Sequence, residues 1–180
     1  MQTRTYQEAY FMERRDIDIA HFHYDAAQLR DHWLVLCAGS FEEGAFNAMT
    51  ISWGSYGQIW NKMFFQVFVR PTRYTFEFME KYDAFTLNAF EPKYKPALSI
   101  IGSKSGRNGN KIAEAGLTPE ASRTVAAPCF KEASLVIECR KIYWQDIEYT
   151  HFLEPSIEGN YPKKDYHRMY FGEIVHVSRV

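Results

Sequence analysis

Apolar residues along the chain follow the two-residue period of strands over several segments, and helical patterns are fewer. Residues 33–38 (WLVLCA) are continuously apolar, which is typical of a strand buried on both faces, and residues 47–53 (NAMTISW) alternate. The glycine-bounded residues 39–44 between them predict a hairpin loop. Further strands are predicted at residues 63–69, 84–89, 133–142 and 169–177, the last with a bulge or kink at Gly172.

Thr72 is a good N-cap for a helix over residues 73–81, while residues 94–101 and 111–115 are weaker helix candidates. Short strands that close on themselves, with a few helices outside, predict a mainly β fold with α decoration, arranged as a small β-barrel. No repeat or linker divides the chain, so residues 1–180 are expected to form a single domain. The irregular residues 92–128 and 149–166 would be long excursions, which are often functional.

Composition narrows the class of partner. The 21 basic and 22 acidic residues give a net charge of −1, so no general cationic field attracts nucleic acid or an anionic membrane. Three cysteines without a CxxC pair indicate reduced thiols, and Cys37 and Cys139 fall in strand patterns that predict the core. The N-terminus (MQTRTYQEAYFMERRDID) lacks a signal-peptide core, and no stretch reaches the ~18 apolar residues of a membrane helix, so we expect a soluble, cytoplasmic protein.

A cluster of basic and hydroxyl side chains is a candidate anion site. Arg70 ends a predicted strand, and Thr72, Arg73 and Thr75 stand at a predicted helix N-terminus, where free N–H groups favour a phosphate. In the alternative interpretation Thr72 only caps the helix, and the arginines pair with acidic residues on the surface of the same helix.

Residues 102–111 (GSKSGRNGNK) add Lys104, Arg107 and Lys111 to this cluster. The loop has no GK[ST] as a P-loop requires, and no GxGxxG follows a predicted strand, so neither nucleotide motif is supported. What remains is a cationic loop that either closes over an anion or is simply solvated.

The histidines do not predict a metal site. His21 and His23 would share one face of an extended segment, but no third ligand stands at a supportive spacing. His167 follows Asp165, which gives either an orienting pair or a surface pair, and the surface pair is favoured.

The stretch AMTISWGSYGQIWNK (residues 48–62) begins as a strand and then breaks into glycines and hydroxyl residues between Trp53 and Trp60. Glycine lets a flat ligand approach exposed backbone groups closely, and an indole on either side could flank that ligand. In the alternative, both tryptophans pack in the core. The aromatic content of 17% suits either interpretation, since aromatic rings favour strands and also bind flat ligands.

Six segments stand in a familiar order: NAMTISWG (47–54), IWNK (59–62), FVRPTRYT (68–75), FTLNAF (85–90), SKSGRNGNKIAEAGL (103–117) and HRMYFGEIV (167–175). Together they resemble the flavin reductase-like FMN-binding split-barrel family, in particular its flavoredoxin-type branch, over about residues 31–177. The resemblance implies a split β-barrel that binds FMN non-covalently near a homodimer interface. The chain departs from the family pattern at Asn110, where an acidic residue is common, and at Met63, where proline is common.

The resemblance also implies a set of FMN-binding residues, with the strand end at the ring and ribityl chain and the cationic segments at the phosphate. These residues are Asn47, Thr50, Ser52, Trp53, Arg70, Thr72, Arg73, Thr75, Ser103, Lys104, Arg107 and Lys111. Ile51, Gly54 and Lys62 are added as further candidates for binding FMN. A cation such as Lys62 or Lys104 would favour the reduced flavin. Trp60, Tyr56 and His167 are candidates to border the open face of the ring.

The implied function is that of a flavin reductase-type oxidoreductase, which passes electrons from NADH or NADPH, or from a redox partner protein, through FMN. One alternative is an electron-carrier module that binds FMN without oxidising a pyridine nucleotide. Another is a split-barrel relative that binds haem, a different phosphate-bearing cofactor, or none.

Overall fold

The computed structural model describes residues 13–180, so the first twelve residues of the N-terminal stretch discussed above lie outside it. The strands of the described part are β1 (Arg15–Asp16), β2 (Leu34–Ser40), β3 (Ala45–Ile51), β4 (Gly54–Ile59), β5 (Lys62–Val69), β6 (Ala84–Ala89), β7 (Pro119–Glu120), β8 (Cys129–Phe130), β9 (Leu135–Asp146) and β10 (Arg168–Arg179). Strands β7 and β8 form a short ribbon, and the other eight form one antiparallel sheet.

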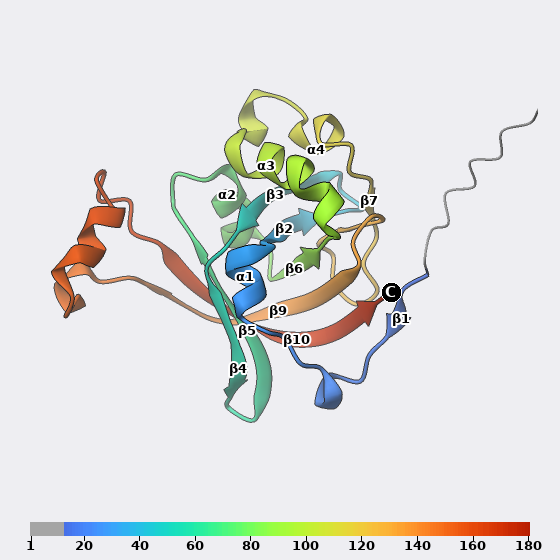
Figure 1. Cartoon of the computed structure of the whole chain (residues 1–180), viewed down its shortest axis with the longest axis horizontal. Coiled ribbons are helices and arrows are strands. Elements are labelled where there is room, and N and C mark those ends of the chain that lie inside the picture. The colour runs from blue at the N-terminus through green and yellow to red at the C-terminus, as the bar shows by residue number, and fades with distance from the viewer. Residues whose placement is uncertain (1–12) are drawn as a thin grey trace, which may run out of the picture.

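The large sheet curls back toward its own edge. Its order is β3-β2-β6-β9-β10-β5-β4, with β1 paired to β10. The strands at the two ends of this order, β3 and β4, are consecutive in the chain and are joined only by Ser52 and Trp53. The two edges therefore meet at one corner without pairing, and Figure 1 shows the resulting curved, open barrel. This confirms the predicted mainly β, split-barrel fold.

Helices lie on the outside of this sheet. They are η1 (Ile19–His21), α1 (Ala27–Asp31), α2 (Tyr74–Lys81), η2 (Pro92–Tyr94), α3 (Lys95–Ser103), η3 (Gly106–Asn108), α4 (Lys111–Glu114), η4 (Tyr149–His151) and η5 (Pro155–Asn160). Helices α2 and α3 pack against β2 and β3, and α3 and α4 lie together at the top of the view in Figure 1. The predicted helices over residues 94–101 and 111–115 are confirmed by α3 and α4.

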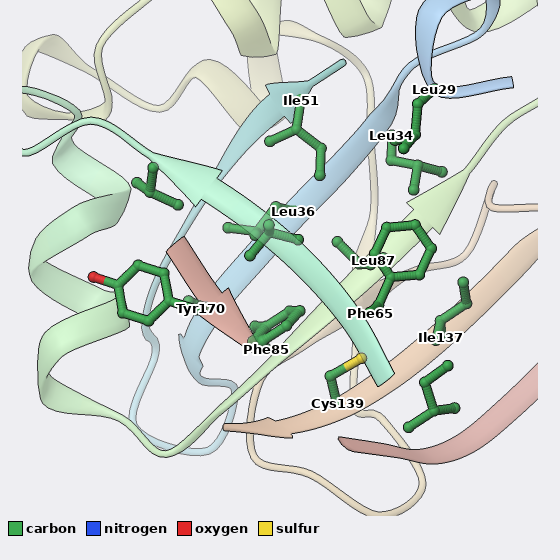
Figure 2. Close-up of a cluster of buried hydrophobic side chains, with 14 of the residues drawn as sticks. Leu29, Leu34, Leu36, Ile51, Phe65, Phe85, Leu87, Ile137, Cys139 and Tyr170 are labelled. Carbon is green, nitrogen blue, oxygen red and sulfur yellow. The ribbon is translucent and has the colours of Figure 1, made fainter. Parts of the chain in front are cut away.

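Aromatic and aliphatic side chains fill the barrel. Phe65, Phe85 and Tyr170 are fully buried, and Figure 2 shows them between the strands with Leu36 and Ile137. Burial of one large apolar side chain stabilises a fold by roughly 1.5–3 kcal/mol. Part of the aromatic excess is therefore explained by packing.

The three cysteines are free and buried, which confirms the prediction of unpaired thiols and of core positions for Cys37 and Cys139. Burial raises the pKa of the Cys129 thiol to about 11. The thiols are therefore protonated at neutral pH and are not nucleophiles.

The predicted strands are confirmed with small shifts at their ends. Strand β2 extends through Gly39 and Ser40, so the loop between β2 and β3 is shorter than predicted. The bulge predicted at Gly172 is confirmed by a register shift against β9 between Phe171 and Gly172. A Cβ atom at Gly172 would lie 2.5 Å from the ring of Phe85, so the close approach requires glycine.

The prediction that the chain breaks up after Trp53 is wrong. Residues 54–59 form β4, which pairs with β5 along its whole length. Trp60 and Asn61 make the turn, with φ of 52° and 58°, as tight two-residue hairpin turns require. Of the residues of β4, Tyr56 packs toward the core, beside Phe22 and Phe65. The sequence of this strand therefore lacks the apolar alternation from which a strand is predicted.

The prediction that Thr72 caps the following helix is also wrong. Helix α2 begins at Tyr74, with Arg73 at the N-cap and no side-chain cap. The Thr72 hydroxyl donates instead to Asp165, at 3.4 Å.

Residues 148–166 form an arm between β9 and β10, closed at its base by a hydrogen bond from the Ile147 N–H to the His167 carbonyl, at 3.0 Å. The arm, orange to red, projects from the body in Figure 1. It carries η4 and η5, and the prediction of an irregular excursion here is confirmed. Among residues 13–180, no helix has both the length and the apolar character needed to span a membrane.

Candidate functional site

Two hollows meet at the corner where β3 ends. The aromatic hollow, of about 170 Å³, is lined by Met49, Thr50, Ile51, Ser52, Trp53, Phe68, Arg70 and His167. The helix hollow, of about 420 Å³, is lined by Trp33, Thr50, Ile51, Ser52, Leu98, Ser99, Gly102 and Ser103. They share Thr50, Ile51 and Ser52, so the end of an edge strand forms the wall between them. Together they have a size that suits a small-molecule ligand.

Aromatic rings surround the first hollow. Trp53 is 46% exposed, and its ring centroid lies 5.2 Å from that of His167. Phe68 also meets His167 edge-on, with ring centroids 6.3 Å apart. An exposed indole beside a hollow is available to a flat ligand, so Trp53 does not simply pack in the core.

His167 is a buried, neutral group at this site. It is 8% exposed, and its Nδ1 lies 2.9 Å from the Tyr161 hydroxyl. Burial, with a contribution from the nearby Arg70 charge, lowers the pKa of His167 to about 4. The surface pair predicted for His167 and Asp165 is wrong, because His167 is buried against Tyr161 and Asp165 pairs with Arg70.

Arg70 ties the arm to the barrel. Its guanidinium donates to the Asp165 carboxylate and to the Asn160 carbonyl, each at 2.8 Å, and lies 4.9 Å from the centroid of the Tyr161 ring. Burial alone would raise the pKa of Asp165, but the hydrogen bond and charge of Arg70 leave that pKa below its ordinary value. Arg70 therefore lines the aromatic hollow while much of its hydrogen-bonding capacity is used by the arm.

On the other side of the corner, α3 packs tightly onto β3. The Thr50 hydroxyl donates to the Leu98 carbonyl at 2.6 Å, and a Cβ atom at Gly102 would lie 3.1 Å from Cβ of Thr50. Arg73 donates to the Gly102 carbonyl at 2.6 Å, and burial, together with Arg70, lowers the pKa of Arg73. The Ser103 hydroxyl borders the helix hollow and donates to the Ser99 carbonyl.

Asn47 and Thr75 are buried behind the loop that follows α3. Asn47 is 4% exposed, and its amide donates to the Thr75 hydroxyl at 2.8 Å. A Cβ atom at Gly106 would lie 2.3 Å from the Asn47 side-chain oxygen, so glycine is required for the loop to pack there. The hydrogen bond between these two predicted ligands thus joins β3 to α2 in this structure.

Three cations of the loop are already engaged by protein groups. Lys104 pairs with Glu114, and Arg107 pairs with Glu77. The surface-pair alternative thus holds for Arg107 but not for Arg70, which pairs with Asp165, or for Arg73, which donates to the Gly102 carbonyl. Lys111 is 4% exposed and donates to the carbonyls of Ile101 and Lys104, at 2.8 and 2.9 Å. Burial, followed by the charge of Arg73, lowers the pKa of Lys111 to about 8.

Asn110, where the family often has an acidic residue, keeps the capping role that a carboxylate would have. Its side-chain oxygen accepts from the Ala113 N–H at 3.0 Å and so caps α4. The departure from the family pattern therefore leaves the local structure intact.

Lys62 and Trp60 lie at the far end of β5 from Arg70. Eight strand residues at ~3.3 Å each put them roughly 25 Å away, so one chain does not bring them to the hollows. Lys62 pairs with Glu173, and Trp60 packs on Tyr143.

The role given to Gly54, close approach by a ligand, is not the one that the structure supports. A Cβ atom at Gly54 would lie 2.6 Å from the Gln66 carbonyl oxygen and within 3.4 Å of Phe65 and Leu29. Packing between β4 and β5 therefore requires this glycine.

The structure gathers only part of the predicted set around the hollows: Thr50, Ile51, Ser52, Trp53, Arg70, Ser103 and His167. Sequence analysis missed Phe68 and Tyr161 as members of the site, and it assigned Asp165 to His167 although Asp165 pairs with Arg70. Phe68 belongs to a strongly apolar predicted strand, whose pattern suggests a packing role. Tyr161 lies in an irregular segment, and its sequence does not indicate that the tyrosine folds back onto His167. Among residues 13–180, no group of three or more His, Cys, Asp or Glu side chains could hold a metal ion.

Comparisons with known proteins agree with this geometry. The family model described as "Flavin reductase like domain" matches residues 30–180. An FMN-binding domain of a flavin reductases-like enzyme from Shewanella baltica is similar in structure, with a TM-score of 0.68 and 17% identity over 93% of this chain and 77% of that one. The flavoredoxin of Desulfovibrio vulgaris gives a TM-score of 0.65 and 23% identity over 83% and 69%.

The flavoredoxin of Methanosarcina acetivorans gives a TM-score of 0.62 and 22% identity, over 81% of this chain and 67% of that chain. At these identities the likeness concerns the fold. No match was found among curated proteins.

Proposed function

The chain belongs to the flavin reductase-like domain family, and we propose that it is a flavoprotein that holds FMN non-covalently at the corner between β3 and β4. The observation that carries this proposal is the pair of hollows sharing Thr50, Ile51 and Ser52. The outer edge of β3 has no partner strand within residues 13–180, and such an edge offers backbone N–H and C=O groups, which suit the heteroatoms along one edge of a flavin ring.

The residues at the corner fit both parts of FMN. Trp53 offers a flat apolar surface for a ring, because its indole is largely exposed beside His167. Ser52 and Ser103 offer hydroxyl groups, and Arg70 and Arg73 offer further N–H donors for a phosphate group. We place the phosphate with these groups because Ser52, Arg70 and Ser103 line the hollows, whereas Lys104 and Arg107 do not.

When bound, FMN would supply the redox chemistry, accepting electrons from NADH, NADPH or a partner protein and passing them on. The chain's own residues would bind and orient it. Trp53 and His167 border the aromatic hollow and would lie beside the bound ring. With its pKa near 4, His167 stays neutral at physiological pH and adds no charge to the site.

We also propose that two copies form a homodimer with FMN near the interface. Trp60, Phe64, Tyr143 and Phe171 form an aromatic cluster at the hairpin tip, in which Trp60 is 58% and Tyr143 42% exposed. Clusters of this kind commonly mark protein interfaces. A second copy is also the means by which Trp60 and Lys62 would reach a flavin site. Size-exclusion chromatography with light scattering tests this: a monomer at micromolar concentration contradicts it.

A visible spectrum tests the cofactor. The purified protein, or the protein after addition of FMN and gel filtration, is expected to show flavin absorbance. A colourless protein that takes up no FMN overturns the proposal. Anaerobic addition of NADH and then NADPH distinguishes the two modes of function, since bleaching by either nucleotide identifies a flavin reductase. A flavin that only dithionite or a reduced partner protein bleaches identifies an electron carrier.

A further inference from the structure

The arm places one hydroxyl group against His167. The Tyr161 hydroxyl lies 2.9 Å from Nδ1 of His167, and the two rings meet edge-on at 5.5 Å. Tyr161 is 4% exposed, and no other hydrogen bond to its hydroxyl exists within residues 13–180. Nε2 of His167 has no partner among the same residues, and His167 lines the aromatic hollow.

A neutral imidazole carries one N–H, so the partner at Nδ1 determines what Nε2 presents to the hollow. If Nδ1–H donated to Tyr161, the phenol proton would be buried without an acceptor, which is unfavourable. If the phenol donates, every buried hydrogen-bonding atom of the pair is satisfied. Burial raises the pKa of Tyr161 above its ordinary value, so the phenol keeps its proton at neutral pH.

We propose that Tyr161 is a positioning residue: its hydroxyl donates to Nδ1 of His167 and holds the imidazole in the tautomer whose Nε2–H faces the aromatic hollow. The inference deepens the proposed function and rests on it for the ligand. That ligand presents a hydrogen-bond acceptor to Nε2–H, either a carbonyl oxygen or ring nitrogen of the flavin, or the carboxamide oxygen of a nicotinamide.

Arg70 of the barrel and neighbouring residues of the arm hold Tyr161 in place. The Arg70 guanidinium lies 4.9 Å from the Tyr161 ring, the Phe152 ring stacks on it at 6.1 Å, and Tyr166 contacts it at 4.9 Å. The Tyr161 N–H donates to the Glu158 carbonyl at 2.8 Å. The residues that dock the arm on the barrel thus also fix the phenol, which gives this excursion a role at the site.

Tyr161→Phe tests the proposal, because it removes one oxygen atom and keeps the ring. The tautomer of His167 is read from the ¹⁵N and ¹H shifts of histidine-labelled protein without flavin. The wild type is expected to carry its proton on Nε2, and the variant to show a mixture of both tautomers. Tyr149→Phe is the matched control, since the Tyr149 ring stacks on Tyr166 within the arm but does not contact His167.

A wild-type Nδ1–H, or a tautomer that Tyr161→Phe leaves unchanged, overturns the inference. In protein loaded with FMN, the Tyr161→Phe rate of flavin reduction at saturating pyridine nucleotide is expected to fall about tenfold, or about 1.4 kcal/mol, with FMN affinity changed less than threefold. An unaltered rate at unaltered FMN affinity also overturns it. Failure of the wild type to bind FMN would reject the proposed function, while the tautomer measurement would still decide the role of Tyr161.

Discussion

Replacement of Arg70 by alanine is expected to release the arm while the barrel stays folded. The change removes hydrogen bonds to Asp165 and to the Asn160 carbonyl, and the contact with the Tyr161 ring. The side chains of Arg70 and Asp165 are only 26% and 14% exposed, so solvent screens this pair less than a surface pair. Charge-assisted hydrogen bonds contribute about 1.5–3 kcal/mol each and the cation–π contact about 0.5–1 kcal/mol, before the entropy of ordering the arm is subtracted.

We expect a net loss of about 3 kcal/mol in the free energy of opening the arm, which corresponds to roughly a hundredfold faster amide exchange. The reporters are the Tyr161 and Lys164 N–H groups, which are hydrogen-bonded within the arm to the carbonyls of Glu158 and Tyr161. Exchange in β9 and β10 should be unchanged, because their ladder does not involve Arg70.

Arg107→Ala is the matched control. Arg107 also pairs with a carboxylate, Glu77, and lies 4.8 Å from a tyrosine ring, that of Tyr74. Its side chain and that of Glu77 are 44% and 57% exposed, however, and exposed pairs contribute about 0.2–1 kcal/mol. Arm exchange that is the same in the two variants, or unaltered in Arg70→Ala, would show that the arm is held by its aromatic contacts alone.

Three further predictions concern the strand corner, the buried histidine and the loop lysine. Gly54→Val is expected to lower the free energy of unfolding in urea by about 1–3 kcal/mol, because the valine side chain would meet the backbone of Gln66. A variant that keeps full stability but loses FMN binding would instead support close approach of a ligand to Gly54. Folding lowers the pKa of His167 from about 6.5 to about 4, so its contribution to the free energy of unfolding is full above pH 6.5 and declines as the pH falls toward 4. The loss is about 2 kcal/mol at pH 5. In His167→Gln the midpoint of urea unfolding should therefore change less between pH 7 and pH 5 than in the wild type. Lys111→Met should lower the free energy of unfolding by about 1–3 kcal/mol, and it should weaken the binding of FMN and of riboflavin equally. A loss of affinity confined to FMN would indicate that Lys111 contacts the phosphate.

Regular strands were the predictable part of this fold. The segments that became β2, β3, β5, β6, β9 and β10 carry enough apolar and β-branched residues for their pattern to be read without a structure. Strand β4 does not, since four of its six residues are glycine, serine or glutamine, and it is a strand because β5 pairs with it across the Trp60–Asn61 turn. Pairing between segments is a tertiary effect that local composition does not contain.

The contacts of the cationic residues at the site could not be predicted from the sequence either. Charge and spacing drew attention to the segments around Arg70 and Lys111, but the direction of each long side chain depends on its neighbours in space. Arg107 turns to Glu77, Lys104 to Glu114, and Lys111 to two carbonyl groups at the end of α3. A cluster of positive charge in sequence thus became a set of separate structural pairs.

Arg70 links the arm to the ligand site, and this link has a thermodynamic consequence. Its guanidinium lines the aromatic hollow and at the same time binds Asp165 in the arm. By reciprocity, a ligand that favours Arg70 in its present position must stabilise the docked arm, and a ligand phosphate that draws Arg70 away from Asp165 must loosen it. Amide exchange at Tyr161 and Lys164 with and without FMN therefore reports which of these holds, and Arg70→Ala should abolish the difference in either case.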